Sequence, residues 1–187
     1  TYEYNLPNKE KKLLKELEIP SGYERDNYIV KRVNCLAHDG RKIPITITYH
    51  KDTKLDGSAN LLLYGYGSYG HTISPSFSTT RLSLINRNII WATAHIRGGM
   101  ERGMKYWEEG KMLNKKNTFK DYISCAKHLI DQKYTGKGKI IGYGGSAGGL
   151  LMGAVVNEAP ELFLGMIMAV PFVDSLTTNL DHSLPLT

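Results

Sequence analysis

The chain has 187 residues, of which 41% are hydrophobic and 22% charged, a composition typical of one globular domain and not of a disordered protein. Its net charge of +6 is dispersed. Lysines cluster only at residues 9–15 and in the Asn-Lys-Lys-Asn sequence at 114–117, which we interpret as solvated surface. No basic stripe with interleaved aromatic residues and no long apolar run are present. We therefore expect neither a nucleic-acid nor a membrane partner.

The two cysteines, Cys35 and Cys125, are far apart in the sequence and match neither a CxxC redox pair nor a zinc-ligand spacing. This pattern predicts free thiols in a reducing compartment. The first residues also lack the apolar core of a secretory signal peptide. We expect a cytoplasmic protein without a metal ion or a cofactor.

The first part of the chain predicts antiparallel strands. Residues 1–35 are polar and rich in lysine, and the breakers Pro7, Pro20 and Gly22 favour short strands joined by turns, as in an edge or a linker. Residues 41–50 alternate isoleucine and tyrosine with proline and threonine, which predicts a strand that is buried on one face.

The rest of the chain alternates strands with helices. Four runs, at residues 60–67, 88–99, 138–145 and 164–174, are apolar throughout, as is typical of parallel strands covered on both faces. Residues 118–133 have the apolar spacing of an amphipathic helix, with Thr118 and Asp121 as its expected capping pair. Residues 147–160 are apolar nearly all round and end at a proline, which predicts a buried helix. Together these elements predict an α/β fold with a doubly wound, mostly parallel sheet and a site at the carboxyl ends of its strands.

A G-x-S-x-G sequence lies between the third of these strands and the buried helix, at residues 144–148. In this context the glycines allow a sharp turn that lifts the Ser146 hydroxyl above the sheet. The backbone N–H of Ala147 would then lie beside an attacked carbonyl, and the helix start would stabilise the oxyanion. The pattern indicates a nucleophilic serine, although a glycine-rich turn with an incidental serine is the alternative.

Two glycine loops also resemble dinucleotide-binding sequences. Residues 65–70 have the G-x-G-x-x-G spacing, but a Pro75-containing Ser/Thr segment follows, and no acidic residue occurs from Gly57 through Met100. Residues 142–147 fit G-x-G-x-x-A, and Asp174 ends the following strand. A non-catalytic nucleotide-binding protein therefore remains an alternative function.

Several separate segments, in order, resemble the peptidase domain of the prolyl oligopeptidase family. They are LLLYGYGSYG, HIRGGMERG, KKNTFKDYISCAKHLI, YGGSAGGLLMGAVVNEAPELF and VPFVDSLTTNLDHSLPLT. The likeness is greatest to its oligopeptidase B branch, also called protease II. The resemblance implies an α/β-hydrolase fold over residues 41–187, with residues 1–40 connecting it to a β-propeller. It also implies a cytosolic serine peptidase that cleaves short peptides after Arg or Lys.

Carried over to this chain, the resemblance implies specific residue roles. Ser146 matches the nucleophile, and the N–H of Ala147 together with the hydroxyl of Tyr66 matches the oxyanion hole. Tyr69 and Phe172 match aromatic residues that line the pocket beside the scissile bond, for which simple core packing is the alternative. We interpret Arg97 as structural and His95 as a hydrogen-bonded core or loop histidine.

The triad acid and histidine are not apparent in this sequence. An α/β-hydrolase triad runs Ser, Asp or Glu, then His along the chain, and among the 41 residues after Ser146 we consider Asp174, Asp181 and His182 as partners. Asp174 ends the strand directly after the nucleophile helix, a position that does not suit the triad acid. Asp181 and His182 are adjacent, which does not suit an acid that must orient a histidine while the histidine reaches the serine. We therefore expect a fold that is incomplete at the C-terminus and inactive alone, with either poor solubility or a need for a complementing C-terminal chain. An esterase or lipase on the same fold is a further alternative.

Overall fold

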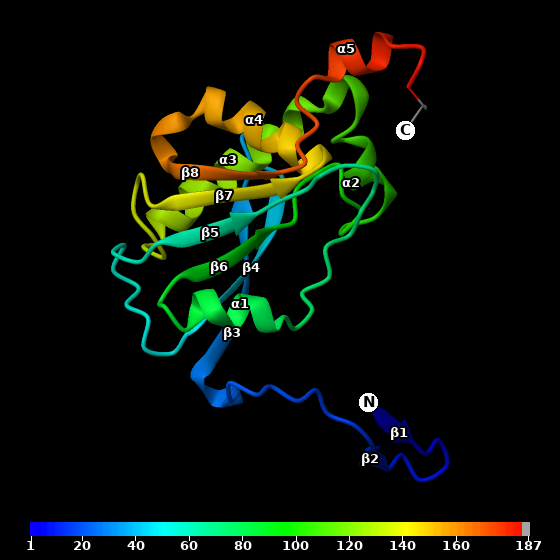
Figure 1. The fold of residues 1–187 in the computed structure, drawn as a ribbon, viewed down its shortest axis with the longest axis vertical. Helices are drawn as coiled ribbons and strands as arrows, with labels where there is room; N and C mark the ends of the chain where they lie inside the picture. Colours follow the sequence, from blue (N-terminus) through cyan, green and yellow to red (C-terminus); the bar gives the residue numbers. More distant parts are fainter. Residues whose placement is uncertain (185–187) are drawn as a thin grey trace.

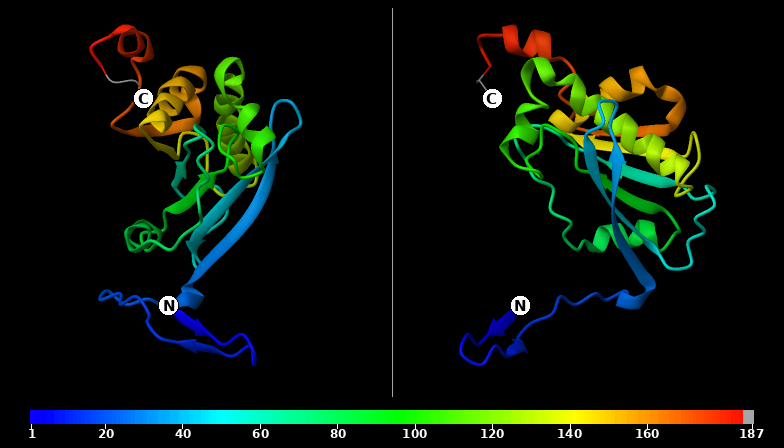
Figure 2. Two further views of the ribbon diagram at one scale, coloured as in Figure 1. Left: turned by 90° about the vertical axis from the view of Figure 1, so that its right-hand side faces the viewer. Right: turned by 180° about the vertical axis from the view of Figure 1, so that it is seen from behind.

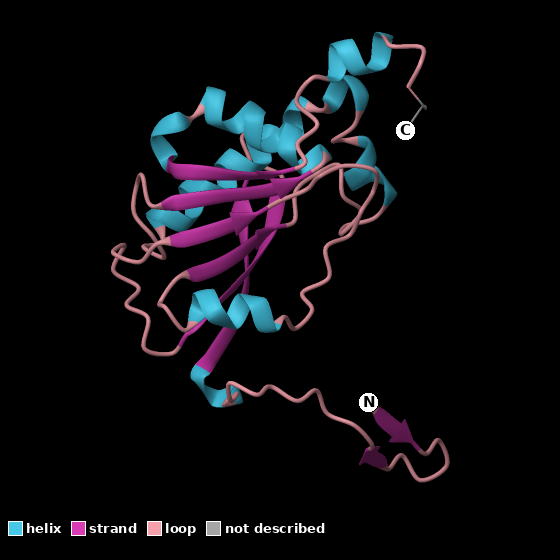
Figure 3. Ribbon diagram, viewed as in Figure 1, coloured by secondary structure: helices cyan, strands magenta, loops and turns pink. Residues whose placement is uncertain are grey.

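The computed structural model describes residues 1–184 and contains one main sheet with helices on both faces (Figures 1 and 3). The strands are β1 (Tyr2–Tyr4), β2 (Lys11–Leu13), β3 (Tyr28–Leu36), β4 (Lys42–His50), β5 (Leu61–Tyr64), β6 (Ile90–Ala94), β7 (Ile140–Gly145) and β8 (Phe163–Ala169). The α-helices are α1 (Thr79–Ile85), α2 (Met104–Glu108), α3 (Lys116–Asp131), α4 (Ala147–Glu158) and α5 (Ser175–Leu180). Short 3-10 turns are η1 (Arg25–Asn27), η2 (Met112–Asn114) and η3 (Pro160–Leu162).

The main sheet has six strands in the order β3-β4-β6-β5-β7-β8. β3, β4 and β6 pair antiparallel, whereas β6, β5, β7 and β8 run parallel. The four apolar runs form β5, β6, β7 and β8, so the expected mostly parallel α/β sheet is confirmed. Its parallel strands all end at the edge where the glycine loops lie, which places a site there.

Helices α3 and α4 cover one face of the sheet, and α1 covers part of the other (Figure 2). The larger core lies on the α3 and α4 side and includes Ile43, Ile45 and Ile47 of β4, all fully buried. The alternation in residues 41–50 therefore predicted the inward face correctly. The expectation of burial on one face alone is wrong, because Pro44 and Thr46, on the opposite face, are also buried.

Residues 1–24 lie mainly outside this core. β1 and β2 form a separate antiparallel hairpin, set apart from the sheet in Figure 1. The main sheet begins at Tyr28, where β3 pairs with β4 along its length as an edge strand. The proposed boundary between a connecting segment and the domain, at residue 40, stays a prediction.

Two further sequence expectations are wrong in detail. β8 is not covered on both faces: within residues 1–184 it is the other edge of the sheet, and Leu164, Ile167 and Met168 are exposed, because no described element packs beyond it. Thr118 and Asp121 do not cap α3, which begins two residues earlier, at Lys116. Both side chains are fully buried instead.

Candidate active site

Ser146 lies at a sharp turn between β7 and α4, as the glycine pattern predicted. Its φ of 53° is unusual for a residue with a side chain and costs about 1–3 kcal/mol. Gly144 and Gly148 are required, because a Cβ on Gly144 would lie 2.2 Å from the carbonyl oxygen of Gly148, and a Cβ on Gly148 would lie 2.9 Å from that of Gly65. Backbone hydrogen bonds fix the turn: Ser146 N donates to Ala169, and the Ser146 carbonyl accepts from Phe172 at 3.0 Å. The side chain of Ser146 is exposed at this rigid turn.

The two predicted oxyanion donors lie next to this turn. Ala147 is the first residue of α4, so its backbone N–H has no partner within the helix. Tyr66, in the loop after β5, packs against the start of α4, because a Cβ on Gly148 would lie 3.3 Å from its Cδ2. Burial, with a smaller contribution from Tyr69, raises the pKa of the Tyr66 phenol. A raised pKa keeps the hydroxyl protonated and able to donate a hydrogen bond at neutral pH.

A mostly apolar cavity of about 310 Å³ adjoins the turn and contains both predicted pocket residues, Tyr69 and Phe172. Tyr69 is 70% exposed and has a φ of 57°, so it is not a core residue. Phe172 is half-buried. Ala147 also lines the cavity, which connects the pocket to the oxyanion position. The other lining residues are Ser68, Gly98, Trp107, Gly110, Lys111, Met112, Lys115 and Leu150.

Lys115 is the charged residue that sequence reasoning missed. Within the Asn-Lys-Lys-Asn sequence we expected solvated lysines, and Lys116 is indeed exposed. Lys115, however, is half-buried, and its ammonium group donates hydrogen bonds to Gly67 O and, at 2.7 Å, to Ser68 Oγ. Burial lowers the pKa of Lys115 to about 8. No local sequence signal distinguishes it from its exposed neighbour, because its partners lie 47 and 48 residues away.

His95 is a buried, hydrogen-bonded core residue, as expected. Its Nε2 lies 2.8 Å from Thr46 Oγ1, and its Nδ1 lies 3.4 Å from Glu101 Oε1. Only 1% of His95 is exposed, so it is unavailable as a general base for Ser146. Glu101 also accepts a hydrogen bond from the backbone of Ile73, which ties the loop after β5 to this buried cluster.

Arg97 has a structural role, as expected, but its partners were not predicted. Its guanidinium donates to Asp121 from Nε at 2.8 Å and from Nη2 at 2.6 Å, and to Asp39 from Nη1 at 2.6 Å. Asp121 therefore neutralises a buried arginine instead of capping α3. Thr118, the other member of the expected capping pair, donates to the backbone carbonyl of Arg97.

The acidic residues and the histidine after α4 do not form a triad with Ser146. Asp174 accepts a hydrogen bond from Thr177 N and caps α5. Asp181 accepts from the backbone and the hydroxyl of Ser183. His182 is exposed. Among residues 1–184, no hydrogen bond joins any of these side chains to the Ser146 hydroxyl, in agreement with the sequence interpretation.

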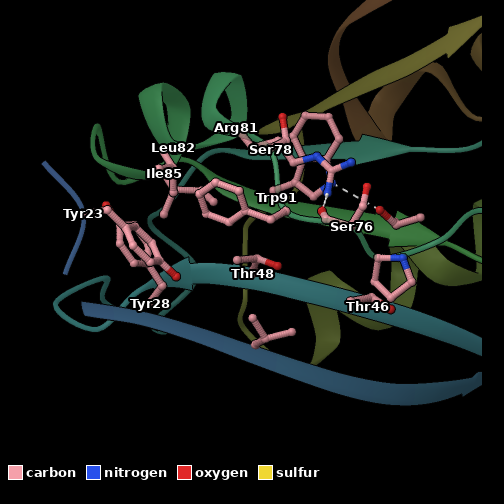
Figure 4. Close-up of a pocket in the computed structure, with 14 residues that line it drawn as sticks. Tyr23, Tyr28, Thr46, Thr48, Ser76, Ser78, Arg81, Leu82, Ile85 and Trp91 are labelled. Carbon is pink, nitrogen blue, oxygen red and sulfur yellow. Dashed lines mark hydrogen bonds between the residues drawn. The ribbon is translucent and has the colours of Figure 1, made fainter. Parts of the chain in front are cut away.

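A second cavity, of about 210 Å³, lies on the α1 face of the sheet (Figure 4). Tyr23, Tyr28 and Trp91 are among the aromatic residues that line it, and Arg81 lies over the Trp91 ring. None of the predicted site residues lines this cavity. Its position therefore separates it from the chemistry at Ser146.

Metal-binding clusters and membrane-spanning helices are both absent from the part of the chain that the structure describes. No group of three or more potential metal-ligating side chains comes together there. No helix in the same residues has the length and apolarity needed to cross a bilayer.

Comparison with known proteins identifies close relatives of the chain. It is 47% identical to dipeptidyl aminopeptidase BI of Pseudoxanthomonas mexicana over 188 aligned residues, which cover 100% of this chain and 26% of the relative. It is also 47% identical to protease 2 of Moraxella lacunata, covering 100% of this chain and 27% of the relative. The chain thus spans about a quarter of the length of these curated relatives.

Solved structures confirm the fold. Oligopeptidase B from Leishmania major matches 99% of this chain with a TM-score of 0.92 and 42% identity, over 26% of its own length. Oligopeptidase B from Trypanosoma brucei, solved with covalently bound antipain, matches 100% of this chain with a TM-score of 0.93 and 43% identity, over 26% of its own length. The sheet and helices therefore correspond to part of an α/β-hydrolase domain.

A family model described as the prolyl oligopeptidase family matches residues 75–187, which include the turn at Ser146 and the aromatic pocket residue Phe172. This match covers more than half of the chain. Together with the relatives and the structures, it shows that the chain belongs to the prolyl oligopeptidase family of serine peptidases.

Proposed function

We propose that the chain carries the nucleophile and the oxyanion hole of an oligopeptidase B-type serine endopeptidase that cleaves short peptides after Arg or Lys. The observation that carries this proposal is the strained, exposed Ser146 at the start of α4, with Ala147 and Tyr66 packed beside it. Strain at a non-glycine residue is maintained only where the surrounding structure enforces it, and it is concentrated at functional sites.

In the proposed reaction, Ser146 Oγ attacks the scissile carbonyl carbon and transfers its proton to a histidine. The carbonyl oxygen becomes an oxyanion that accepts hydrogen bonds from Ala147 N–H and Tyr66 Oη–H. Collapse of the tetrahedral intermediate breaks the C–N bond, and the histidine returns the proton to the leaving amine. Water then hydrolyses the acyl-enzyme on Ser146 and restores the serine. The histidine and its acid would come from polypeptide outside these 187 residues.

The basic P1 preference rests on the likeness to protease 2 and oligopeptidase B. No carboxylate lines the cavity of about 310 Å³ beside Ser146, whereas Lys111 and Lys115 do line it. The acidic residues that would receive a basic side chain must therefore lie elsewhere in the whole protein. A relative 38% identical, from Dictyostelium discoideum, is named prolyl endopeptidase, so a Pro-containing substrate is the natural comparison in any assay.

Three observations weigh against the two alternatives, the esterase or lipase and the nucleotide-binding protein. Membership of a peptidase family favours peptides over the simple acyl esters of an esterase or lipase. The nucleotide-binding alternative needs Asp174 to bind a ribose, but its carboxylate caps α5. Gly142 and Gly144 pack against Met166 and Gly148 and so leave little space for a pyrophosphate.

The assay uses the whole protein that contains this chain, with fluorogenic peptides that differ only in having Arg, Lys or Pro at P1. We expect turnover after Arg and Lys that is abolished by Ser146→Ala and unaffected by Ser183→Ala, a matched change at an exposed serine. The 187-residue chain by itself should show no turnover, since no histidine is hydrogen-bonded to the Ser146 hydroxyl among residues 1–184. Equal activity of the Ser146→Ala variant would refute the proposed nucleophile, and preference for Pro would refute the proposed specificity.

Two further proposals concern the surroundings of the protein. The exposed apolar side chains on β8 support a complementing C-terminal segment that pairs with this edge. The free, buried thiols of Cys35 and Cys125 are compatible with the proposed cytoplasmic location. Their sulfur atoms lie 3.5 Å apart although the residues are 90 positions apart in the sequence. Mixing the chain with a C-terminal segment, and fractionating cells, would test these two proposals separately.

A further inference from the structure

The loop that carries Tyr66 is hydrogen-bonded to a half-buried cation, Lys115. Lys115 lies at the start of α3, and its Nζ donates to Gly67 O and Ser68 Oγ. These two acceptors follow Tyr66 directly and precede Tyr69, so they lie between the proposed oxyanion donor and the proposed pocket wall. Ser68 is itself buried, which makes this a formed interaction and not a surface contact.

The ammonium group of Lys115 has no carboxylate partner among residues 1–184, since all ion pairs in that part of the chain involve other residues. The titratable groups that share its cavity are Lys111, which lies over the Trp107 ring, and Tyr69. Helix α4 contributes only Ala147 and Leu150 to this cavity. A half-buried cation without a counter-ion costs free energy, and charged groups in such environments are concentrated at functional sites.

We propose that Lys115 is a positioning residue for the peptidase reaction: its ammonium group fixes the Gly67–Ser68 peptide so that the Tyr66 hydroxyl stays in the oxyanion hole. This inference rests on the proposed function. Lys115 does not need to touch the substrate, because it acts through the backbone of the loop that carries Tyr66.

Tight packing alone is the competing explanation for the shape of this loop. Gly67 and Tyr69 both have positive φ, and a Cβ on Gly67 would clash with Thr118 and Ile96. If packing were sufficient, removal of the Lys115 charge would leave the reaction unchanged. A double-mutant cycle with Tyr66 separates the two explanations, because only residues that act together give non-additive effects.

The kinetic test uses Lys115→Met in the whole protein, with Lys116→Met as the matched control at an exposed neighbouring lysine. We expect Lys115→Met to lower kcat by about 10- to 100-fold with little change in KM, because a misplaced oxyanion donor acts mainly in the transition state. In a Tyr66→Phe background the same change should have almost no further effect. A change confined to KM, or additive losses in the double variant, would overturn the proposal.

The pH dependence supplies a readout that simple packing would not alter. Because burial lowers the pKa of Lys115 to about 8, its positive charge is present below that pH and is lost as the pH rises through it. We expect the kcat of the unaltered protein to fall above pH 8. Lys115→Met should lack this alkaline limb, and Lys115→Arg, which stays charged, should retain its rate there. An identical alkaline limb in all three proteins would contradict the role of Lys115.

Hydrogen exchange tests the inference without any turnover. Lys115→Met should speed amide exchange in residues 66–70 relative to Lys116→Met, while exchange in β5 and β7 stays unchanged. If the whole protein has no peptidase activity, the proposed function fails, and exchange still decides whether Lys115 holds the loop. Unchanged exchange in residues 66–70 would overturn the inference even if the peptidase activity is confirmed.

Discussion

Arg97 and Asp121 form a buried two-point ion pair that joins the end of β6 to α3. Arg97 Nε and Nη2 lie 2.8 and 2.6 Å from the two carboxylate oxygens, and Asp121 Oδ2 also accepts from the backbone N–H of Arg97. Gly98 directly follows this pair in the sequence, and its N–H donates to Tyr106 of α2 while its carbonyl accepts from Gly70, in the loop after β5. The position of the loop beside Ser146 thus depends on an interaction in the core.

Removal of one partner of this pair should destabilise the whole fold. Asp121→Ala leaves the Arg97 charge buried with the half-exposed Asp39 and the more distant Glu109, at 4.0 Å, as partners, and we expect a loss of about 3–5 kcal/mol in the free energy of unfolding. Chemical denaturation followed by circular dichroism measures this loss. Asp131→Ala, at the exposed end of the same helix, is the control and should change stability little. Equal stability of the two variants would contradict the structural role of the pair.

The same network predicts that the free energy of unfolding depends on pH in the acidic range. Partial burial acts to raise the pKa of the Asp39 carboxyl, but hydrogen bonds from Arg97 and the backbone of Arg41 bring it below its ordinary value. Its stabilising contribution is therefore fully present above the ordinary pKa of aspartate, about 4, and is lost as the pH falls through the lower folded value. Asp39→Asn should reduce the loss of stability between about pH 5 and pH 2. Identical pH profiles of the free energy of unfolding in Asp39→Asn and the unaltered protein would refute the stabilising role of the Asp39 carboxylate.

A side chain at Gly98 should lower the activity, because it would clash with the loop that carries Tyr66. Its φ is +92°, and an added Cβ would lie 2.0 Å from the carbonyl oxygen of Gly67, so Gly98→Ala must displace the loop that carries Tyr66. We expect loss of about 10²-fold or more in kcat/KM in the whole protein. Gly103→Ala is the control. Its φ is +90° but no atom lies within 4 Å of an added Cβ, so it measures the effect of backbone strain without a clash. Similar losses in both variants would exclude the loop displacement as the cause.

Tyr66→Phe tests the oxyanion hole itself. The change removes one hydroxyl and keeps the ring that packs against α4, so the fold should be retained. We expect kcat to fall by about one to three orders of magnitude with a smaller change in KM. Tyr64→Phe, on the neighbouring strand β5, is the matched control. Steady-state kinetics with unchanged kcat for Tyr66→Phe would remove this hydroxyl from the mechanism.

Local patterns in the sequence predicted the parts of the fold that depend on local chemistry. The apolar runs predicted β5, β6 and β7, and the glycines around Ser146 predicted the turn, because both depend on residues close together in the chain. The resemblance to a family added Tyr66, which spacing alone could not connect to Ser146, 80 positions later.

The errors have a common physical cause in long-range contacts. Thr118 and Asp121 have the spacing of a capping pair, but Arg97, 24 residues before Asp121, provides a buried partner that outweighs the cap. Lys115 and Lys116 are adjacent lysines that no local pattern distinguishes, yet Lys115 binds the loop at Ser68 and Lys116 is exposed to solvent. β8 is as apolar as β7, so its exposure depends on which elements pack beside it and not on its own residues.

The most direct test of the central claim is covalent labelling of the whole protein with a fluorophosphonate, followed by mass spectrometry of the peptide that contains Gly144–Gly148. The account predicts a single adduct on Ser146, with labelling slowed by Tyr66→Phe and absent in Ser146→Ala. Labelling of a different serine in catalytically active protein, or full activity without modification of Ser146, would contradict it.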